Sequence, residues 1–176
     1  THGGQGYAEG GVGVGKLFLP RRLSFGPDGL LYVTDYRVVV TIDQTGYIRR
    51  YAGDPTPPAY SNPYYSSEVP NQSVRHLDGP KENALFYQLE GIAIDSKGNI
   101  FLADNINSVI RKIDKTSGQV STYTGVVGLS ERYTAKNGDI SSATFSESGG
   151  LVIDSKDNLY VLDKFNGVRK ISTDGN

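Results

Sequence analysis

Three aspartates recur at matched positions along the chain, and they are the residues that first suggest chemistry. Asp35, Asp104 and Asp163 each follow a short apolar run and precede a turn-forming stretch, at separations of 69 and 59 residues. Carboxylates gathered in one place could bind a divalent cation or act as a general acid and base. An aspartate at a strand end, however, also accepts hydrogen bonds from turn amides. We therefore predict that all three are structural residues.

Two further stretches contain the oxygen-bearing side chains that calcium prefers. Residues 95–99 read Asp-Ser-Lys-Gly-Asn, and residues 154–158 read Asp-Ser-Lys-Asp-Asn. A calcium-binding loop also needs a downstream glutamate that binds the ion through both oxygens, and neither stretch has one. We predict instead that both are turns between strands, in which Gly98 or Asn99 supplies a positive φ and Asn158 takes the matching structural position.

The sequence lacks the usual catalytic arrangements. It contains no cysteine, which excludes a cysteine nucleophile, a thiolate zinc site and a disulfide scaffold. Its two histidines, His2 and His76, are isolated from each other and form no recognisable Ser–His–Asp pattern. The glycine-rich residues 10–15 are not followed by a helical segment, as a phosphate-binding loop requires. We therefore expect no catalytic residue, no metal and no cofactor, and predict that the chain is not an enzyme.

The aspartates belong to an internal repeat of short apolar segments. The blocks at 22–43, 91–114 and 150–172 align with one another, and an aligned phenylalanine precedes each block. Within each block, β-branched and aromatic runs are separated by turns rich in Gly, Asn, Asp and Ser, which predicts consecutive antiparallel strands. A four-stranded meander repeated along a chain is typical of the blades of a β-propeller.

The two best-preserved copies resemble the NHL-repeat family of β-propellers. The resemblance rests on residues 95–104 followed by Ile-Arg-Lys-Ile at 110–113, and on residues 154–163 followed by Val-Arg-Lys-Ile at 168–171. The first copy is weaker, because residues 40–42 read Val-Thr-Ile where the family has an Arg-Lys step. The three copies together cover nearly the whole chain.

This resemblance implies an all-β, β-propeller-like fold with three NHL-type four-stranded blades in a single region, 1–176. The blades are expected at about 17–54, 85–126 and 144–176, with the last one incomplete because its fourth strand would begin at residue 173. An unpaired strand edge recruits another strand. We therefore expect either a polypeptide that continues or a homo-oligomer or filament that self-assembles by strand completion.

A segment rich in proline and tyrosine separates the first two blades. Residues 55–70 hold five of the eight prolines, which cannot join a sheet ladder. The same segment holds Tyr60, Tyr64 and Tyr65, so we predict an irregular insertion that is either a spacer or an interaction surface. The sequon that starts at Asn71 is a predicted N-glycosylation site and would make the chain a glycoprotein.

The balance of charge limits the kinds of partner. Lys and Arg number 18 and Asp and Glu number 19, so the net charge is −1 and we expect no nucleic-acid partner. Arg111 and Arg169 recur at one position of the repeat and are assigned to the predicted interaction surface. No apolar run is long enough to span a membrane.

The framework of the repeat also points to a class of function. This chain resembles bacterial surface proteins with long NHL arrays in three short stretches. These are Asp-Gly at residues 78–79, Ala-Leu-Phe at 84–86 and Gly-Asn at 98–99. This similarity implies a non-catalytic binding or structural module, extracellular or at the cell surface, with a protein or glycan partner. Two alternatives remain open, namely a fragment of a metal-dependent propeller lyase or lactonase, and an RNA-binding NHL propeller.

Overall fold

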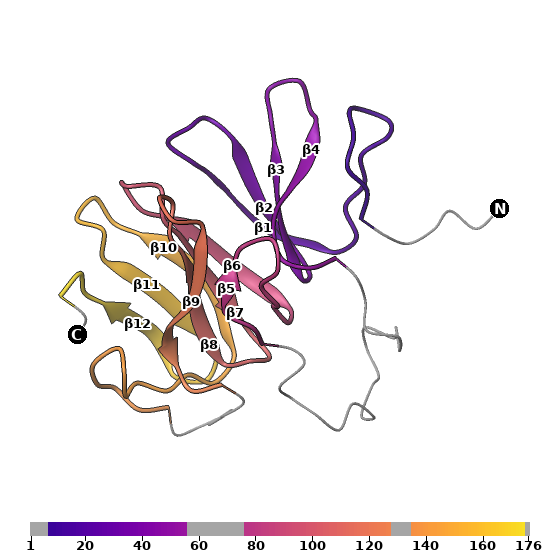
Figure 1. Cartoon of the computed structure of the whole chain (residues 1–176). Coiled ribbons are helices and arrows are strands. Elements are labelled where there is room, and N and C mark those ends of the chain that lie inside the picture. The colour runs from indigo at the N-terminus through magenta and orange to yellow at the C-terminus, as the bar shows by residue number, and fades with distance from the viewer. Residues whose placement is uncertain (1–6, 56–75, 128–134, 175–176) are drawn as a thin grey trace, which may run out of the picture.

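Three antiparallel sheets form the computed structural model, which describes residues 7–55, 76–127 and 135–174 (Figure 1). These described residues contain strands and turns but no helix. The sheets follow one another along the chain, and each corresponds to one copy of the repeat. The predicted all-β fold of three propeller-like blades, the last of them incomplete, is confirmed.

The first blade is a four-stranded meander whose strands pair in chain order. Its strands are β1 (Pro20–Phe25), β2 (Leu31–Asp35), β3 (Val38–Ile42) and β4 (Ile48–Ala52). Tyr36 lies in the short turn between β2 and β3 with a φ of 57°, a left-handed conformation that suits a tight hairpin. Gly46, with a φ of 76°, plays the same part between β3 and β4.

The second blade has one strand more than the repeat predicted. Its strands are β5 (Gly79–Pro80), β6 (Leu89–Ile94), β7 (Ile100–Asp104), β8 (Val109–Ile113) and β9 (Gln119–Gly125). Their order across the sheet is β5-β9-β8-β7-β6, so the short β5 precedes the meander in sequence but lies beyond its outer strand. Pro80 can occupy this position because an edge strand does not need its amide for the ladder.

The third blade has three strands among the described residues. These are β10 (Ser148–Ile153), β11 (Leu159–Asp163) and β12 (Gly167–Ile171), which pair in chain order. The side of β12 that faces away from β11 therefore has no neighbouring strand in the described part of the chain.

The turns at 95–99 and 154–158 connect strands, and their asparagines act through their side chains. Gly98 supplies the positive φ of 85°, and Asp157 takes this conformation in the third blade with a φ of 62°. Asn99 instead donates its side-chain amide to Asp95 Oδ2 at 2.8 Å. Asn158 makes the matching bond to Asp154 Oδ2 at 2.9 Å. Each asparagine thus closes its own turn with a side-chain hydrogen bond.

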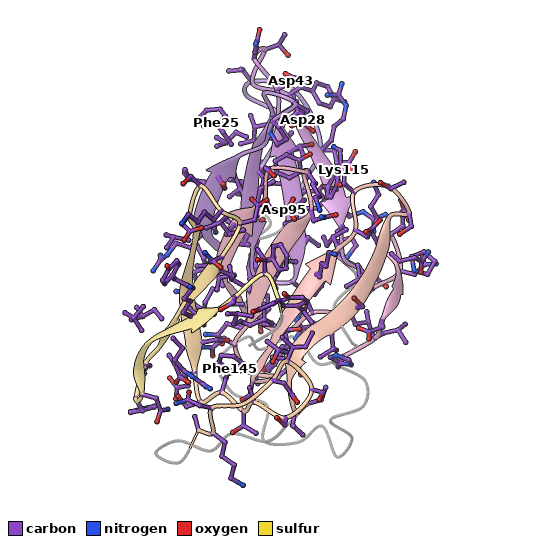
Figure 2. All side chains as sticks on the ribbon, turned by 90° about the vertical axis from the view of Figure 1, so that its left-hand side faces the viewer. Phe25, Asp28, Asp43, Asp95, Lys115 and Phe145 are labelled. Carbon is purple, nitrogen blue, oxygen red and sulfur yellow. The ribbon has the colours of Figure 1, made fainter. Side chains whose placement is uncertain are left out.

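The inner strands of the three blades hold the molecule together. Strand β6 packs against β1 on one side and β10 on the other, and apolar side chains fill the space between neighbouring sheets. Phe86 lies in the core between the first two blades, and Phe145 lies in the core between the last two. Lys115 and Asp28 form an ion pair of 2.9 Å between the first two blades, and Figure 2 shows this pair far from Phe145.

Candidate functional site

The strand-end aspartates each bind the loop that leads into the inner strand of their own blade. Asp35 accepts hydrogen bonds from the amides of Phe18 and Leu19, and Asp104 accepts one from the amide of Tyr87 at 2.9 Å. Asp163 is bonded to the hydroxyl of Ser146. The three carboxylates lie in three different sheets and are not brought together into one site.

Asp104 is also the centre of a buried polar network. Its carboxylate is fully buried and accepts from Asn107 Nδ2 at 2.9 Å and from Arg111 Nη1 at 3.0 Å. Arg111 Nη2 donates to Asp78 Oδ1 at 2.6 Å and to the carbonyl of Leu77 at 2.9 Å. This network ties the loop before the inner strand to the middle of the second blade.

The prediction that Arg111 and Arg169 form an interaction surface is wrong. Arg111 has no exposed side-chain surface, and the side chain of Arg169 is 10% exposed. Arg169 donates to Asp163 at 3.2 Å and to the carbonyls of Thr144 and Lys136. Both guanidiniums are therefore committed to neighbouring strands and loops. The same burial removes these two guanidiniums from the surface to which an RNA would bind.

Sequence reasoning could have detected the burial of these arginines. In the first blade, the position that corresponds to Arg111 is occupied by Val40, which is completely buried. Because side chains alternate between the two faces of a strand, a position that holds valine in one copy faces the core in the others.

Burial raises the pKa of the Asp104 carboxyl to about 6, because the loss of solvent disfavours the charged form more strongly than Arg111 and the amide donors favour it. The folded state therefore binds this proton more tightly than the unfolded state does. The contribution of Asp104 to stability is fully present below its ordinary pKa of 3.8 and is lost as the pH rises through about 6.

Asp104→Asn isolates this titration, since an amide does not ionise. We expect the free energy of unfolding of the wild type, minus that of the variant, to fall by about 2 kcal/mol between about pH 4 and about pH 7. Urea unfolding across this range measures the difference, and groups common to both proteins cancel. A difference that stays constant or grows with pH would show that Arg111 keeps the carboxyl ionised at low pH.

Two predicted features cannot be placed. Tyr60, Tyr64, Tyr65 and the sequon at Asn71 lie within residues 56–75, outside the described part of the chain. The interaction surface on the insertion and the glycan at Asn71 therefore remain predictions.

Titratable side chains elsewhere do not assemble a metal site. Across residues 7–55, 76–127 and 135–174, no group of three or more His, Asp or Glu side chains is close enough to hold an ion. His76 lies beside the Asp104 network, with Nε2 2.8 Å from Thr122 Oγ1 and 3.8 Å from Asp78 Oδ1. Desolvation lowers the pKa of His76, so its neutral form is favoured.

A groove lies next to the inner strands of the blades. This axial groove has a volume of about 370 Å³, and β1, β6, β10, β11 and β12 contribute to its wall. Its lining residues are Arg22, Leu23, Ile92, Gly150, Leu151, Val152, Tyr160, Leu162 and Val168. The wall is mostly apolar, as small-molecule sites generally are.

The polar groups of the axial groove are few and distinct. Arg21 pairs with Glu90 across the first two blades at 3.5 Å, whereas Arg22 has no carboxylate partner among the described residues. Tyr160 donates its hydroxyl to Asp154 Oδ2 at 3.2 Å. Desolvation and this hydrogen bond both raise the pKa of Tyr160. The groove can therefore hold an apolar body and offer a guanidinium to an anionic group.

The sequence analysis did not identify the axial groove, although one signal was present. Val152 and Leu162 alternate with core residues along β10 and β11, yet they are 64% and 50% exposed. Apolar residues at both alternating positions predict a strand that is covered on both faces. Which strands contribute to one groove follows only from the way the blades pack.

Comparison with known proteins places the chain among relatives that are longer. The Arabidopsis thaliana protein SUPPRESSOR OF QUENCHING 1, chloroplastic, is 30% identical over 155 residues, which make up 85% of this chain and 13% of that protein. No family model matches the chain, so membership of the NHL-repeat family is not confirmed.

Solved structures with a similar fold are β-propellers. A structural genomics protein from Bacteroides thetaiotaomicron has a TM-score of 0.70 at 24% identity, covering 86% of this chain and 34% of its own. An auxiliary nutrient binding protein from the same organism has a TM-score of 0.62 at 15% identity, with coverages of 90% and 38%. A gluconolactonase from Xanthomonas campestris has a TM-score of 0.56 at 13% identity, with coverages of 92% and 46%. The chain thus spans less than half of each structure.

The prediction that the chain is not an enzyme is contradicted by these comparisons. Propellers of this shape include a gluconolactonase as well as a nutrient-binding protein, so the fold supports both catalysis and binding. No helix within the described residues is long and apolar enough to cross a bilayer. The chain has the β-propeller fold, and its blades correspond to part of a propeller.

Proposed function

We propose that this chain contributes three blades to a ligand-binding β-propeller and that the axial groove is its ligand site. The groove would take a small molecule or a side chain of a partner that joins an apolar body to a negatively charged group. The observation that carries this proposal concerns Arg22, which lines this mostly apolar groove. Its guanidinium has no carboxylate partner among the described residues. A protein or glycan partner and a location outside the cell or at its surface remain part of the same proposal.

The energetics favour a ligand that uses both features. Burying an apolar body against Leu23, Val152 and Leu162 removes their exposed surface from water. A charge-assisted hydrogen bond to Arg22 would then orient the ligand, because it is stronger and more directional than a neutral one. A neutral ligand of the same shape would keep the contribution of apolar burial and lose the charge-assisted hydrogen bond to Arg22.

Binding of 2-naphthoate to the 176-residue chain tests this proposal, with the neutral alcohol 2-naphthylmethanol as the matched ligand. We expect naphthoate to shift the amide NMR signals of Gly150, Leu151 and Val152, and Arg22→Gln to weaken its binding roughly tenfold. Arg21→Gln is the control variant, because its guanidinium is already paired with Glu90. Equal weakening by both substitutions, or equal affinity for the neutral alcohol, would show that Arg22 does not select the ligand.

A further inference from the structure

Arg111 and Arg169 bind their surroundings through the same set of contacts, with one exception. Each donates through Nη1 to the strand-end aspartate of its own blade, which is Asp104 for Arg111 and Asp163 for Arg169. Each also lies over a phenylalanine ring and donates to two backbone carbonyls of the segment that precedes the blade. The second and third blades therefore hold their arginines in matching environments.

The contact that differs is the one to a second carboxylate. In the second blade, Arg111 Nη2 donates to Asp78 Oδ1 at 2.6 Å and to the carbonyl of Leu77, the residue before Asp78. In the third blade, Arg169 Nη2 donates to the carbonyl of Lys136, the residue before position 137. Position 137 therefore corresponds to that of Asp78, and it holds an asparagine.

The asparagine leaves Arg169 with one carboxylate partner among the described residues, Asp163 at 3.2 Å. The first blade has an acid at the corresponding position, because Glu9 precedes a glycine that pairs with the fourth strand, as Asp78 does in the second blade. A side-chain amide cannot supply the negative charge of these acids. Hydrolysis of the amide would supply it.

The residue that follows Asn137 favours this hydrolysis. It is Gly138, and both residues are exposed. The backbone nitrogen that follows an asparagine can attack the side-chain amide carbon, and glycine hinders this attack least because it has no side chain. In the second blade, where a fourth strand pairs with this loop, the side chain of Asp78 is still 44% exposed. The position is therefore open to water in a four-stranded blade as well.

The sequence contains a second Asn-Gly pair, at residues 166–167, whose surroundings hinder the same attack. The side chain of Asn166 donates to Ser146 Oγ at 3.2 Å and to Asp163 Oδ1 at 3.1 Å. Gly167 pairs with Asp163 in the ladder between β11 and β12. Attack on the Asn166 amide therefore requires these contacts to open first.

We propose that Asn137 is a site of spontaneous deamidation, and that its aspartate form pairs with Arg169 as Asp78 pairs with Arg111. The loop before the third blade thereby acquires the acid that the other two blades carry in their sequence. A charge-assisted hydrogen bond then joins this loop to β12, in addition to the one that Arg169 makes with Asp163.

The reaction consumes one water and releases ammonia. The backbone nitrogen of Gly138 bonds to Cγ of Asn137 and the Cγ–Nδ2 bond breaks, so that ammonia leaves with the proton of the Gly138 amide. Water then opens the cyclic imide at either of its carbonyls, which gives aspartate or isoaspartate. Isoaspartate lengthens the main chain by one carbon and attaches its carboxylate directly to Cα, so it does not reproduce the pair with Arg169.

Incubation of the 176-residue chain at mildly alkaline pH, followed by peptide mass spectrometry, tests the site. Each deamidation replaces NH by O in the peptide that contains it. We expect conversion at Asn137 to be roughly tenfold faster than at Asn166, the internal control, because the hydrogen bonds of Asn166 must break first. Gly138→Ala should slow conversion at Asn137 and leave Asn166 unchanged, since the nearest obstacle to the added Cβ is the hydroxyl of Ser142, which can rotate away.

Asn137→Asp tests whether Arg169 accepts the new carboxylate. We expect the melting temperature to rise by about 2 °C at neutral pH, as suits a partly exposed ion pair. The rise should vanish below about pH 3, where the carboxyl is protonated and resembles the amide. Asn83→Asp makes the same change at an exposed position of the second blade and should not raise the melting temperature.

Three results would overturn this assignment. Equal rates at the two asparagines, or no change at Asn137 under conditions that convert a free peptide of residues 135–141, would show that the loop protects this amide. A melting temperature that Asn137→Asp leaves unchanged or lowers would show that Arg169 has no place for a second carboxylate. Neither Asn137 nor Arg169 lines the axial groove, so these results are independent of the 2-naphthoate test.

Discussion

Replacing Arg111 by alanine is expected to lower the free energy of unfolding by about 3–5 kcal/mol. Arg111 is the largest fully buried side chain, and it donates to two carboxylates, Asp104 and Asp78. It also donates to the carbonyls of Leu77 and Leu85, and it lies over the ring of Phe86 at 5.1 Å. The substitution leaves a buried carboxyl and two carbonyls without their donor and opens a cavity beside the core.

Chemical denaturation monitored by tyrosine fluorescence measures this loss. Lys112→Ala is the matched control, because Lys112 is the next residue on the same strand and its side chain is not fully buried. A loss below about 1 kcal/mol for Arg111→Ala would place the arginine in the range of a surface ion pair and contradict its structural role. The double variant Asp104→Leu, Arg111→Met should recover part of the loss, since no fully buried charge is then left unpaired and Asp78 is 44% exposed.

The second large effect is expected for Gly91→Ala, which should destabilise the chain by about 3 kcal/mol. Gly91 lies on β6 where this strand meets β10, and an added Cβ would lie 2.1 Å from the carbonyl oxygen of Gly149. It would also lie 3.0 Å from the side chain of Leu151 and 3.1 Å from that of Ala103. Because the nearest obstacle is backbone, the methyl group fits only if the two blades move apart.

Gly150→Ala serves as the control for this prediction. Gly150 lies on β10 at the same contact between blades, but an added Cβ there would meet nothing within 4 Å. We expect thermal unfolding of this variant to stay within about 0.5 kcal/mol of the wild type. Equal effects of the two substitutions would show that close approach of β6 and β10 does not limit packing of the blades.

The repeat in the sequence was sufficient to predict the architecture. Strand alternation and turn composition are local properties, and their recurrence around Asp35, Asp104 and Asp163 predicts three separate sheets without any knowledge of packing. The three strands that the described residues of the last blade contain follow from the same alignment. The strand at residues 79–80 was not predicted, because a strand of two residues has no detectable periodicity. It is a strand only because it pairs with the edge of β9.

The chemistry of the candidate sites depended on contacts between residues far apart in the sequence. From the sequence alone, Arg111 is expected to be a cation at the surface. Packing places Asp104, Asp78 and two carbonyls around its guanidinium, and these hydrogen bonds offset the cost of burying the charge. The presence of enzymes among the structural neighbours likewise shows that a motif search within one chain does not decide whether a propeller is catalytic.

The sequence by itself determined the number of blades and their order along the chain, because hydrogen-bonding and turn preferences act between residues close in the chain. Only the tertiary structure decided that Arg22 and Val168 line one groove and that Thr124, Phe145 and Ile171 line another cavity. These neighbours come from different strands, and their proximity is set by the angle and distance at which β1, β6 and β10 pack.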